Sequence, residues 1–245
     1  MLVSCADGDA SMIANIDHHT DQNGAAHRLA LQGKRPLILI TGACRGIGLR
    51  CAEALAGRGA ELLLCDIDAT SLEEVADRLG TGEKWLCDVA SEESVSSLAD
   101  RVTERFSSMD MVINAAGGGY ARTLGMYRVS RALLPALGRG TNKLLVNVPP
   151  SPRDSDEPAF PYASSRLAFH RLSSALAFEA RGTPISVYIA CPAKHRLMPV
   201  APDPNAGSWT ESCDLRQPSD NDLTALAWQV AALLDEHRDM KRQIS

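Results

Sequence analysis

The sequence predicts a single α/β domain built around a doubly wound parallel β-sheet. From Pro36 onward, short apolar runs alternate with amphipathic segments of helical period. The runs are continuously apolar, which is typical of parallel strands that helices cover on both faces. With 245 residues, the chain is long enough for one such domain with a sizeable buried core.

The predicted elements follow one another as strand–helix pairs. We expect strands at residues 36–41, 61–66, 85–88, 109–114, 143–147 and 184–190. We expect helices at residues 47–58, 69–80, 91–107, 122–138, 162–181 and 221–237. Ser91 is expected to cap the third helix, with Glu93 in its first turn. Residues 193–219 contain several prolines and are expected to form an irregular loop.

Residues 1–34 differ from the rest of the chain because they sustain no hydrophobic period. They predict a flexible N-terminal extension, followed by one domain over residues 35–245. The segment has neither a basic nor an apolar region of the kind that makes a signal peptide. His18 and His19 are adjacent, an arrangement more typical of a polar tail than of a metal site, so we predict no metal site.

Charge and cysteine content limit the function classes. The net charge of -5 and the absence of a Lys/Arg run argue against a nucleic-acid partner. No apolar stretch reaches the length of a membrane span, so no membrane partner is expected. The seven cysteines are odd in number and show no CxxC spacing, which favours a reduced, cytoplasmic protein.

A glycine-rich turn lies where the first strand ends and the first helix begins. Glycines there let the backbone approach a pyrophosphate, and the helix N-terminus adds free N–H groups and a positive dipole end. The turn runs from Thr41 to Gly48 and predicts a dinucleotide site that includes Gly42, Cys44, Arg45, Gly46, Ile47 and Gly48.

The second predicted strand ends on Asp66, which follows Gly42 by 24 residues. A carboxylate at that place can accept hydrogen bonds from the adenosine ribose and repels a 2′-phosphate. Arg45 could instead favour NADP, but Asp66 decides the prediction for NAD. We place Asp66 and the adjacent Ile67 in the cofactor site.

Six short motifs in order resemble the short-chain dehydrogenase/reductase family, over about residues 36–237. They are the turn at 41–48, Asp88-Val89, the segment 114–117, the segment 131–135, the segment 162–166 and Cys191-Pro192. The resemblance implies a Rossmann-like fold, with Asp88 on the adenine amino group and Val89 beside the ring. It also implies cofactor contacts from Asn114, Ala115, Ala116, Gly117, Tyr162, Arg166 and Pro192.

The family uses an Asn-Ser-Tyr-Lys set for catalysis, and this chain keeps only the tyrosine. Tyr162 is expected to act as the acid/base, with Arg166 as the cation one helical turn later. Arg stays charged and cannot relay a proton as Lys does. The serine position, thirteen residues before Tyr162, falls on Pro149, and Ser151 could replace it only if the loop shifts. Arg122 falls on the asparagine position.

Other departures from the family lie on either side of this set. The stretch between Asn114 and Arg122 is shorter than the family's, and Leu197 takes the position of a Thr that touches the nicotinamide. The end of the chain lacks the family's closing motif, so the last strand is expected to be short or missing. The expected assembly is a homodimer or a complex with a paralogous subunit.

Three function classes remain open at this stage. The first is an NAD-dependent oxidoreductase acting on a small alcohol or carbonyl substrate. The second is a non-catalytic NAD-binding pseudoenzyme that serves as a sensor, a scaffold or a silent partner subunit. The third is the non-redox chemistry of halohydrin dehalogenases, which use Ser-Tyr-Arg; the intact glycine turn and the missing serine weigh against it.

Overall fold

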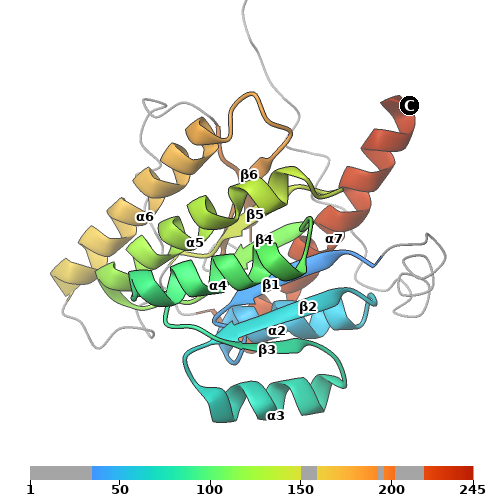
Figure 1. Cartoon of the computed structure of the whole chain (residues 1–245). Coiled ribbons are helices and arrows are strands. Elements are labelled where there is room, and N and C mark those ends of the chain that lie inside the picture. The colour runs from blue at the N-terminus through green and yellow to red at the C-terminus, as the bar shows by residue number, and fades with distance from the viewer. Residues whose placement is uncertain (1–34, 150–158, 193–195, 202–217, 245) are drawn as a thin grey trace, which may run out of the picture.

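The computed structural model describes residues 35–149, 159–192, 196–201 and 218–244 (Figure 1). One seven-stranded sheet runs through this part of the chain in the order β3-β2-β1-β4-β5-β6-β7. The strands are β1 Leu37–Thr41, β2 Glu61–Asp66, β3 Glu83–Leu86, β4 Met111–Asn114, β5 Leu144–Asn147, β6 Ser186–Cys191 and β7 Arg196–Pro199. Every neighbouring pair is parallel except β6 and β7. The predicted N-terminal extension, residues 1–34, lies outside the described residues.

Helices cover both faces of the sheet, as the continuous apolar strands predicted (Figure 1). They are α2 Gly46–Ala56, α3 Ala69–Leu79, α4 Glu92–Arg105, α5 Gly119–Gly138, α6 Ala159–Glu179 and α7 Asp220–Ile244. α2, α3 and α7 pack on one face, and α4, α5 and α6 pack on the other. Within β1, Ile38 and Ile40 face the first layer whereas Leu37 and Leu39 face the second. The doubly wound fold is therefore confirmed.

All predicted helices form; most differ from the predicted bounds by three residues or fewer, but α7 continues to Ile244 instead of ending at residue 237. Ser91 caps α4, because its hydroxyl accepts a hydrogen bond of 3.2 Å from the backbone N–H of Ser94. α5 begins at Gly119 rather than at residue 122, and α6 begins at Ala159 rather than at residue 162. The first turn of α6 contains Pro161, which a helix tolerates there because the first N–H groups have no intrahelical partner.

The region expected to be an irregular loop contains a strand, which corrects the prediction for residues 193–219. β7 runs antiparallel to β6, with Tyr188 opposite Pro199. Proline cannot donate to a ladder and is confined to edge strands, and β7 is the edge of the sheet in the part of the chain described. Leu197, expected at the nicotinamide, lies in β7 and packs against the α2–α7 layer.

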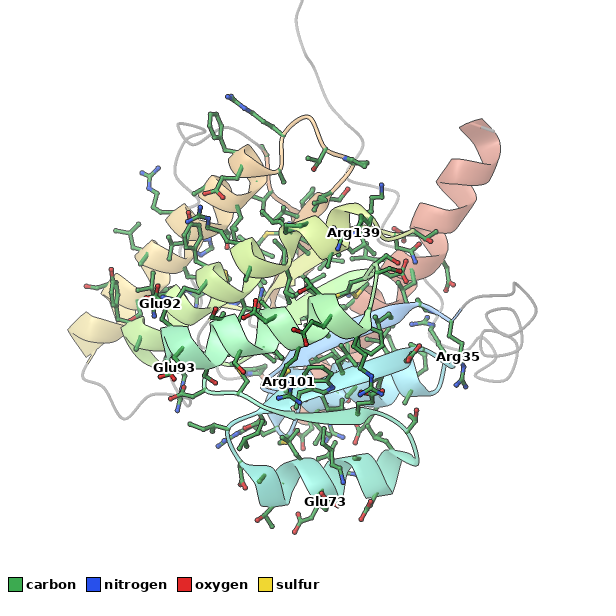
Figure 2. The ribbon with its side chains drawn as sticks, in the orientation of Figure 1. Arg35, Glu73, Glu92, Glu93, Arg101 and Arg139 are labelled. Atoms are coloured by element: carbon green, nitrogen blue, oxygen red, sulfur yellow. The ribbon has the colours of Figure 1, made fainter. Side chains whose placement is uncertain are left out.

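Many charged side chains lie on the outside of the layers, as Glu73 of α3 and Arg139 after α5 show (Figure 2). Among the described helices, none is both long and apolar enough to cross a membrane.

Candidate functional site

A cavity of about 570 Å³ opens at the carboxyl ends of the parallel strands. It lies where the order of the sheet switches direction, between β1 and β4, which is the place where doubly wound sheets bind ligands. Its volume falls in the range of ligand sites. The lining residues are Gly42, Arg45, Gly46, Ile47, Asp66, Ile67, Cys87, Asp88, Val89, Ala115, Ala116, Gly117, Arg122, Val148, Pro149, Pro192, Pro218, Asp220 and Leu223.

The glycines of the turn allow three stretches of backbone to meet at one wall of this cavity. Gly42 has a φ of +67°, and a Cβ there would lie 2.7 Å from the backbone N of Ala116. A Cβ at Gly48 would lie 2.1 Å from the carbonyl oxygen of Gly42. Both positions therefore require glycine for steric reasons. Gly48 shapes the turn but is not itself a lining residue.

The N-terminus of α2 is open to the cavity. α2 begins at Gly46, and the preceding residue, Arg45, makes no side-chain capping bond. The first turn of α2 contains no acidic residue. Gly46 has a φ of +53° and nothing within 4 Å of the place where its Cβ would stand. The uncapped N–H groups and the positive dipole end suit an anionic pyrophosphate.

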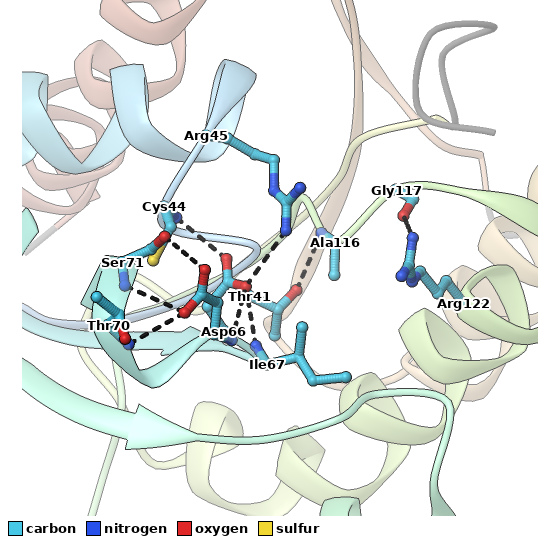
Figure 3. A network of polar contacts seen from close by, with 11 residues as sticks. Thr41, Cys44, Arg45, Asp66, Ile67, Thr70, Ser71, Ala116, Gly117 and Arg122 are labelled. Carbon is cyan, nitrogen blue, oxygen red and sulfur yellow. Dashed lines mark hydrogen bonds and ion pairs between the residues drawn. The ribbon is translucent and has the colours of Figure 1, made fainter. Parts of the chain in front are cut away.

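Asp66 joins the end of β2 to the glycine-rich turn (Figure 3). One carboxylate oxygen, Oδ2, accepts the backbone N–H of Cys44 at 3.2 Å. The other, Oδ1, accepts the backbone N–H of Ile67 at 2.8 Å and lies 3.9 Å from Nη2 of Arg45. The Asp66 side chain is 4% exposed, so these contacts fix a nearly buried carboxylate in the cavity wall.

Cys44 supports the site from behind and does not line the cavity. Burial raises the pKa of its thiol to about 12, and the neighbouring Asp66 carboxylate adds to the increase. The side chain is therefore a neutral thiol near pH 7, and its backbone N–H is the group that holds Asp66.

Asp88 and Val89 follow β3 and line the same half of the cavity as Asp66. Oδ1 of Asp88 accepts the backbone N–H of Ala90 at 2.9 Å, which fixes the direction of the carboxylate. Ile67 is 51% exposed beside them. This half of the cavity thus combines apolar surface with two carboxylates, a combination suited to an adenine ring and ribose hydroxyls.

Asn114 lies behind the cavity and is not a lining residue. Its Nδ2 donates to Oγ of Ser130 and to Oδ1 of Asn147, both at 2.9 Å. Asn147 in turn donates to Ser173 of α6 at 3.3 Å. The network ties β4 and β5 to helices α5 and α6, whereas the next three predicted residues, Ala115, Ala116 and Gly117, do reach the cavity.

The two predicted catalytic residues lie on α6. Tyr162 is in the first turn of the helix, and its side chain lies outside the described residues. Arg166 is 8% exposed, and its Nη2 lies 4.0 Å from Sγ of Cys191 at the end of β6. Arg166 is not among the residues that line the cavity. The acid/base and cation roles of these two residues therefore stay predictions.

Two positions where the chain departs from the catalytic set do line the cavity. Pro149 follows β5 and offers neither a hydroxyl nor an N–H. Arg122 lies in the first turns of α5, and its Nη1 donates to the carbonyl oxygen of Gly117 at 2.9 Å. Pro192, after β6, also lines the cavity.

The sequence did not predict five of the lining residues. Cys87 and Val148 directly follow strands, so strand ends alone could have indicated them. The other three are Asp220 and Leu223 at the start of α7 and Pro218 just before it. α7 packs against α2, and Asp220 lies 3.9 Å from Arg50 of α2. The Ser219–Asp222 capping pair signals a helix start, but no local pattern places that helix beside the glycine turn.

Comparison with known proteins gives a consistent set of relatives. A family profile described as short chain dehydrogenase matches residues 36–196. The rhamnolipid biosynthesis 3-oxoacyl-[acyl-carrier-protein] reductase of Pseudomonas aeruginosa is 29% identical over 199 residues, covering 69% of this chain and 78% of that protein. The L-fucose dehydrogenase of Oryctolagus cuniculus is 27% identical over 194 residues, covering 69% of this chain and 68% of that protein.

Solved structures agree with the fold. Pseudomonas aeruginosa RhlG in complex with NADP has a TM-score of 0.63 and 26% identity, covering 80% of this chain and 89% of that one. A metagenomic short-chain oxidoreductase in complex with NADP has a TM-score of 0.62 and 21% identity, covering 81% and 90% of the two chains.

Proposed function

The chain belongs to the short-chain dehydrogenase family, and we propose that it binds NAD(H) and interconverts a small alcohol and its carbonyl compound. One observation carries the proposal: a single cavity brings together the glycine turn, the open N-terminus of α2 and two carboxylates, Asp66 and Asp88. The N-terminus of α2 suits the pyrophosphate, Asp66 suits the ribose hydroxyls and Asp88 suits the adenine amino group. The three groups lie at the ends of β1, β2 and β3, in the same order as these parts of a dinucleotide.

We propose NAD rather than NADP as the preferred cofactor. A 2′-phosphate would stand against the Asp66 carboxylate, and Asp68 adds a second negative charge two residues later. Arg45 could pair with such a phosphate, because its side chain is 73% exposed. However, Nη2 of Arg45 already lies 3.9 Å from Oδ1 of Asp66. The Asp66 carboxylate therefore repels the phosphate and also competes with it for Arg45. Among the described residues, Arg45 is the only cation that lines the cavity on the Asp66 side.

When bound, the reduced cofactor supplies a hydride to the carbonyl carbon of the substrate. In our proposal the Tyr162 hydroxyl supplies the proton that the carbonyl oxygen takes up, so the product is the neutral alcohol. Arg166, one helical turn from Tyr162, favours the phenolate that remains. In the reverse direction, the phenolate accepts the proton of the alcohol.

A second candidate function is cofactor binding without turnover, and a specific observation favours it. Pro149 occupies the cavity wall at the position of the family's serine and cannot donate to a substrate oxygen. Arg166 in addition is buried beside Cys191 rather than at the cavity wall. A protein of this kind would act as a sensor, a scaffold or a silent partner subunit.

An activity assay separates the two candidates. The purified full chain is tested with NADH against a panel of small aldehydes and ketones, and with NAD against the matching alcohols, beside Tyr162→Phe. If the unchanged protein turns over a substrate and Tyr162→Phe abolishes this turnover, the result supports the oxidoreductase and excludes the non-catalytic protein. Bound NADH without turnover on the whole panel supports the non-catalytic protein.

A further inference from the structure

The charged residues that line the cavity are unevenly distributed along the sheet. Asp66 ends β2 and Asp88 follows β3, so both carboxylates lie on one side of the switch point, with Arg45 beside Asp66. The lining residues that follow β4, β5 and β6 are apolar or glycine, namely Ala115, Ala116, Gly117, Val148, Pro149 and Pro192. Arg122, in the first turns of α5, is the charged lining residue beside these loops, and Asp220 at the start of α7 also lines the cavity, 3.9 Å from Arg50 of α2.

The position of Arg122 is fixed by a local contact. Its Nη1 donates to the carbonyl oxygen of Gly117, the last residue of the β4 loop that lines the cavity. In Figure 3, Ala116 lies between Asp66 and Arg122 in the view, and no ion pair joins these two residues. Among the described residues, no Asp or Glu lies within ion-pair distance of Arg122, unlike Arg128 and Arg131 on the same helix.

We propose that Arg122 makes this site selective for substrates that carry a carboxylate. The inference rests on the proposed function, in which the adenosine lies in the half with Asp66 and the substrate in the half with Arg122. A guanidinium has five N–H donors, of which one is used on Gly117, and its planar fork matches a carboxylate. Arg122 is exposed, so its remaining donors are accessible to a ligand, and Pro149 and Pro192 add apolar surface to the same cavity.

A binding experiment tests this without turnover. The full chain is saturated with NADH at pH 7.5 and titrated with butyrate or with butyramide, which are close in size and are not reduced by a hydride. Ligand-observed NMR measures their dissociation constants. We expect butyrate to bind about tenfold more tightly than butyramide, as a charge-assisted hydrogen-bonded pair provides.

Two variants show whether Arg122 is the cause. Arg122→Gln is expected to remove the preference for butyrate and to leave NADH affinity unchanged. Arg131→Gln makes the same change on the same helix, but its guanidinium pairs with Glu179 outside the cavity, so the preference should remain. Melting temperatures of the three proteins verify that they are folded. The proposal would be overturned if Arg122→Gln kept the preference for butyrate, or if the unchanged protein showed no such preference.

The experiment also distinguishes this proposal from the proposed function. If Arg122→Gln lowers NADH affinity, the guanidinium serves a cofactor phosphate, which overturns the carboxylate proposal and leaves cofactor binding intact. If the unchanged protein binds no NADH, the proposed function fails. The same titrations without NADH then decide the carboxylate proposal: a preference for butyrate that depends on Arg122 supports it, and equal binding of the two ligands refutes it.

Discussion

The backbone N–H of Cys44 donates a hydrogen bond of 3.2 Å to Oδ2 of Asp66. This bond joins the glycine-rich turn to the end of the neighbouring strand, two segments that are far apart in the chain. The carboxylate thereby helps to shape the turn that would hold the pyrophosphate, while it faces the place expected for the ribose. The two parts of the proposed cofactor site therefore depend on each other.

Cys44 should be a poorly reactive thiol, because it is partly buried and lies beside the Asp66 carboxylate. Burial and the Asp66 carboxylate raise the pKa of Cys44 to about 12, from an ordinary value of 9.0. The thiolate is the reactive form, so a rise of this size leaves about a thousandfold less thiolate at pH 8 than an exposed cysteine has. Alkylation by iodoacetamide, followed residue by residue with mass spectrometry, should be slow at Cys44 in the native protein and fast after unfolding. Asp66→Asn should lower the pKa of Cys44 and speed the reaction, and an equal rate in both proteins would contradict this account.

Gly46 and Gly59 form a matched pair of substitutions. Both have positive φ, +53° and +76°, and neither has an atom within 4 Å of the place for a Cβ. Alanine at either position should therefore cost about 1 kcal/mol of folding free energy through backbone strain alone. Only Gly46 lines the cavity. Gly46→Ala should lower NADH affinity by about tenfold, since its methyl group occupies the approach to the α2 N-terminus.

Calorimetric titration with NADH and chemical denaturation measure the two effects separately. Gly59→Ala should match Gly46→Ala in stability and the unchanged protein in NADH affinity. If both variants bind NADH as the unchanged protein does, the N-terminus of α2 is not the pyrophosphate site.

Arg58 and Asp235 hold α7 against α2. Nε of Arg58 lies 3.8 Å from Oδ2 of Asp235, and the guanidinium carbon lies 5.0 Å from the centre of the Trp228 ring. The Arg58 side chain is 10% exposed and that of Asp235 is 47% exposed. Burial lowers the pKa of Arg58. Asp235→Asn should therefore destabilise the fold by about 1 to 2 kcal/mol, less than a fully buried pair because water screens Asp235.

Differential scanning calorimetry checks this as a fall of several degrees in the melting temperature. Glu73→Gln removes the partner of Lys84 in a pair exposed at both ends, so its melting temperature should stay nearly unchanged. If both substitutions lowered the melting temperature equally, the ion pair of Arg58 with Asp235 would contribute no more to stability than an exposed pair.

The sequence predicted the parts of the fold that local patterns control. Continuous apolar runs such as Leu37–Thr41 indicate strands buried on both faces, and the glycines of the turn indicate close backbone contact. It missed β7 because Pro199 argues against a strand unless the strand is known to lie at an edge. It started α5 three residues late because Gly117 to Gly119 resemble a turn.

Long-range packing decides the rest of the site, and one sequence does not show it. Twelve of the predicted cofactor residues meet at one cavity; they are Gly42, Arg45, Gly46, Ile47, Asp66, Ile67, Asp88, Val89, Ala115, Ala116, Gly117 and Pro192. The lining residues from α7 depend on how that helix crosses α2. The side-chain contact between Arg166 and Cys191 depends on how α6 meets β6. The cytoplasmic location and the homodimer or paralogous partner stay predictions.

The central claim is that this cavity binds NAD with the adenosine ribose at Asp66. Calorimetric titration of NADH and NADPH into the unchanged protein, Asp66→Asn and Asp77→Asn tests it most directly. Asn keeps the volume of the side chain and one acceptor oxygen but loses the charge, whereas Asp77 is an exposed residue of α3 outside the cavity. We predict that NADH binds at least about tenfold more tightly than NADPH, that Asp66→Asn removes this preference, and that Asp77→Asn retains it. Absence of NADH binding would contradict the claim. So would a ratio of NADH affinity to NADPH affinity that is the same in the unchanged protein and in Asp66→Asn.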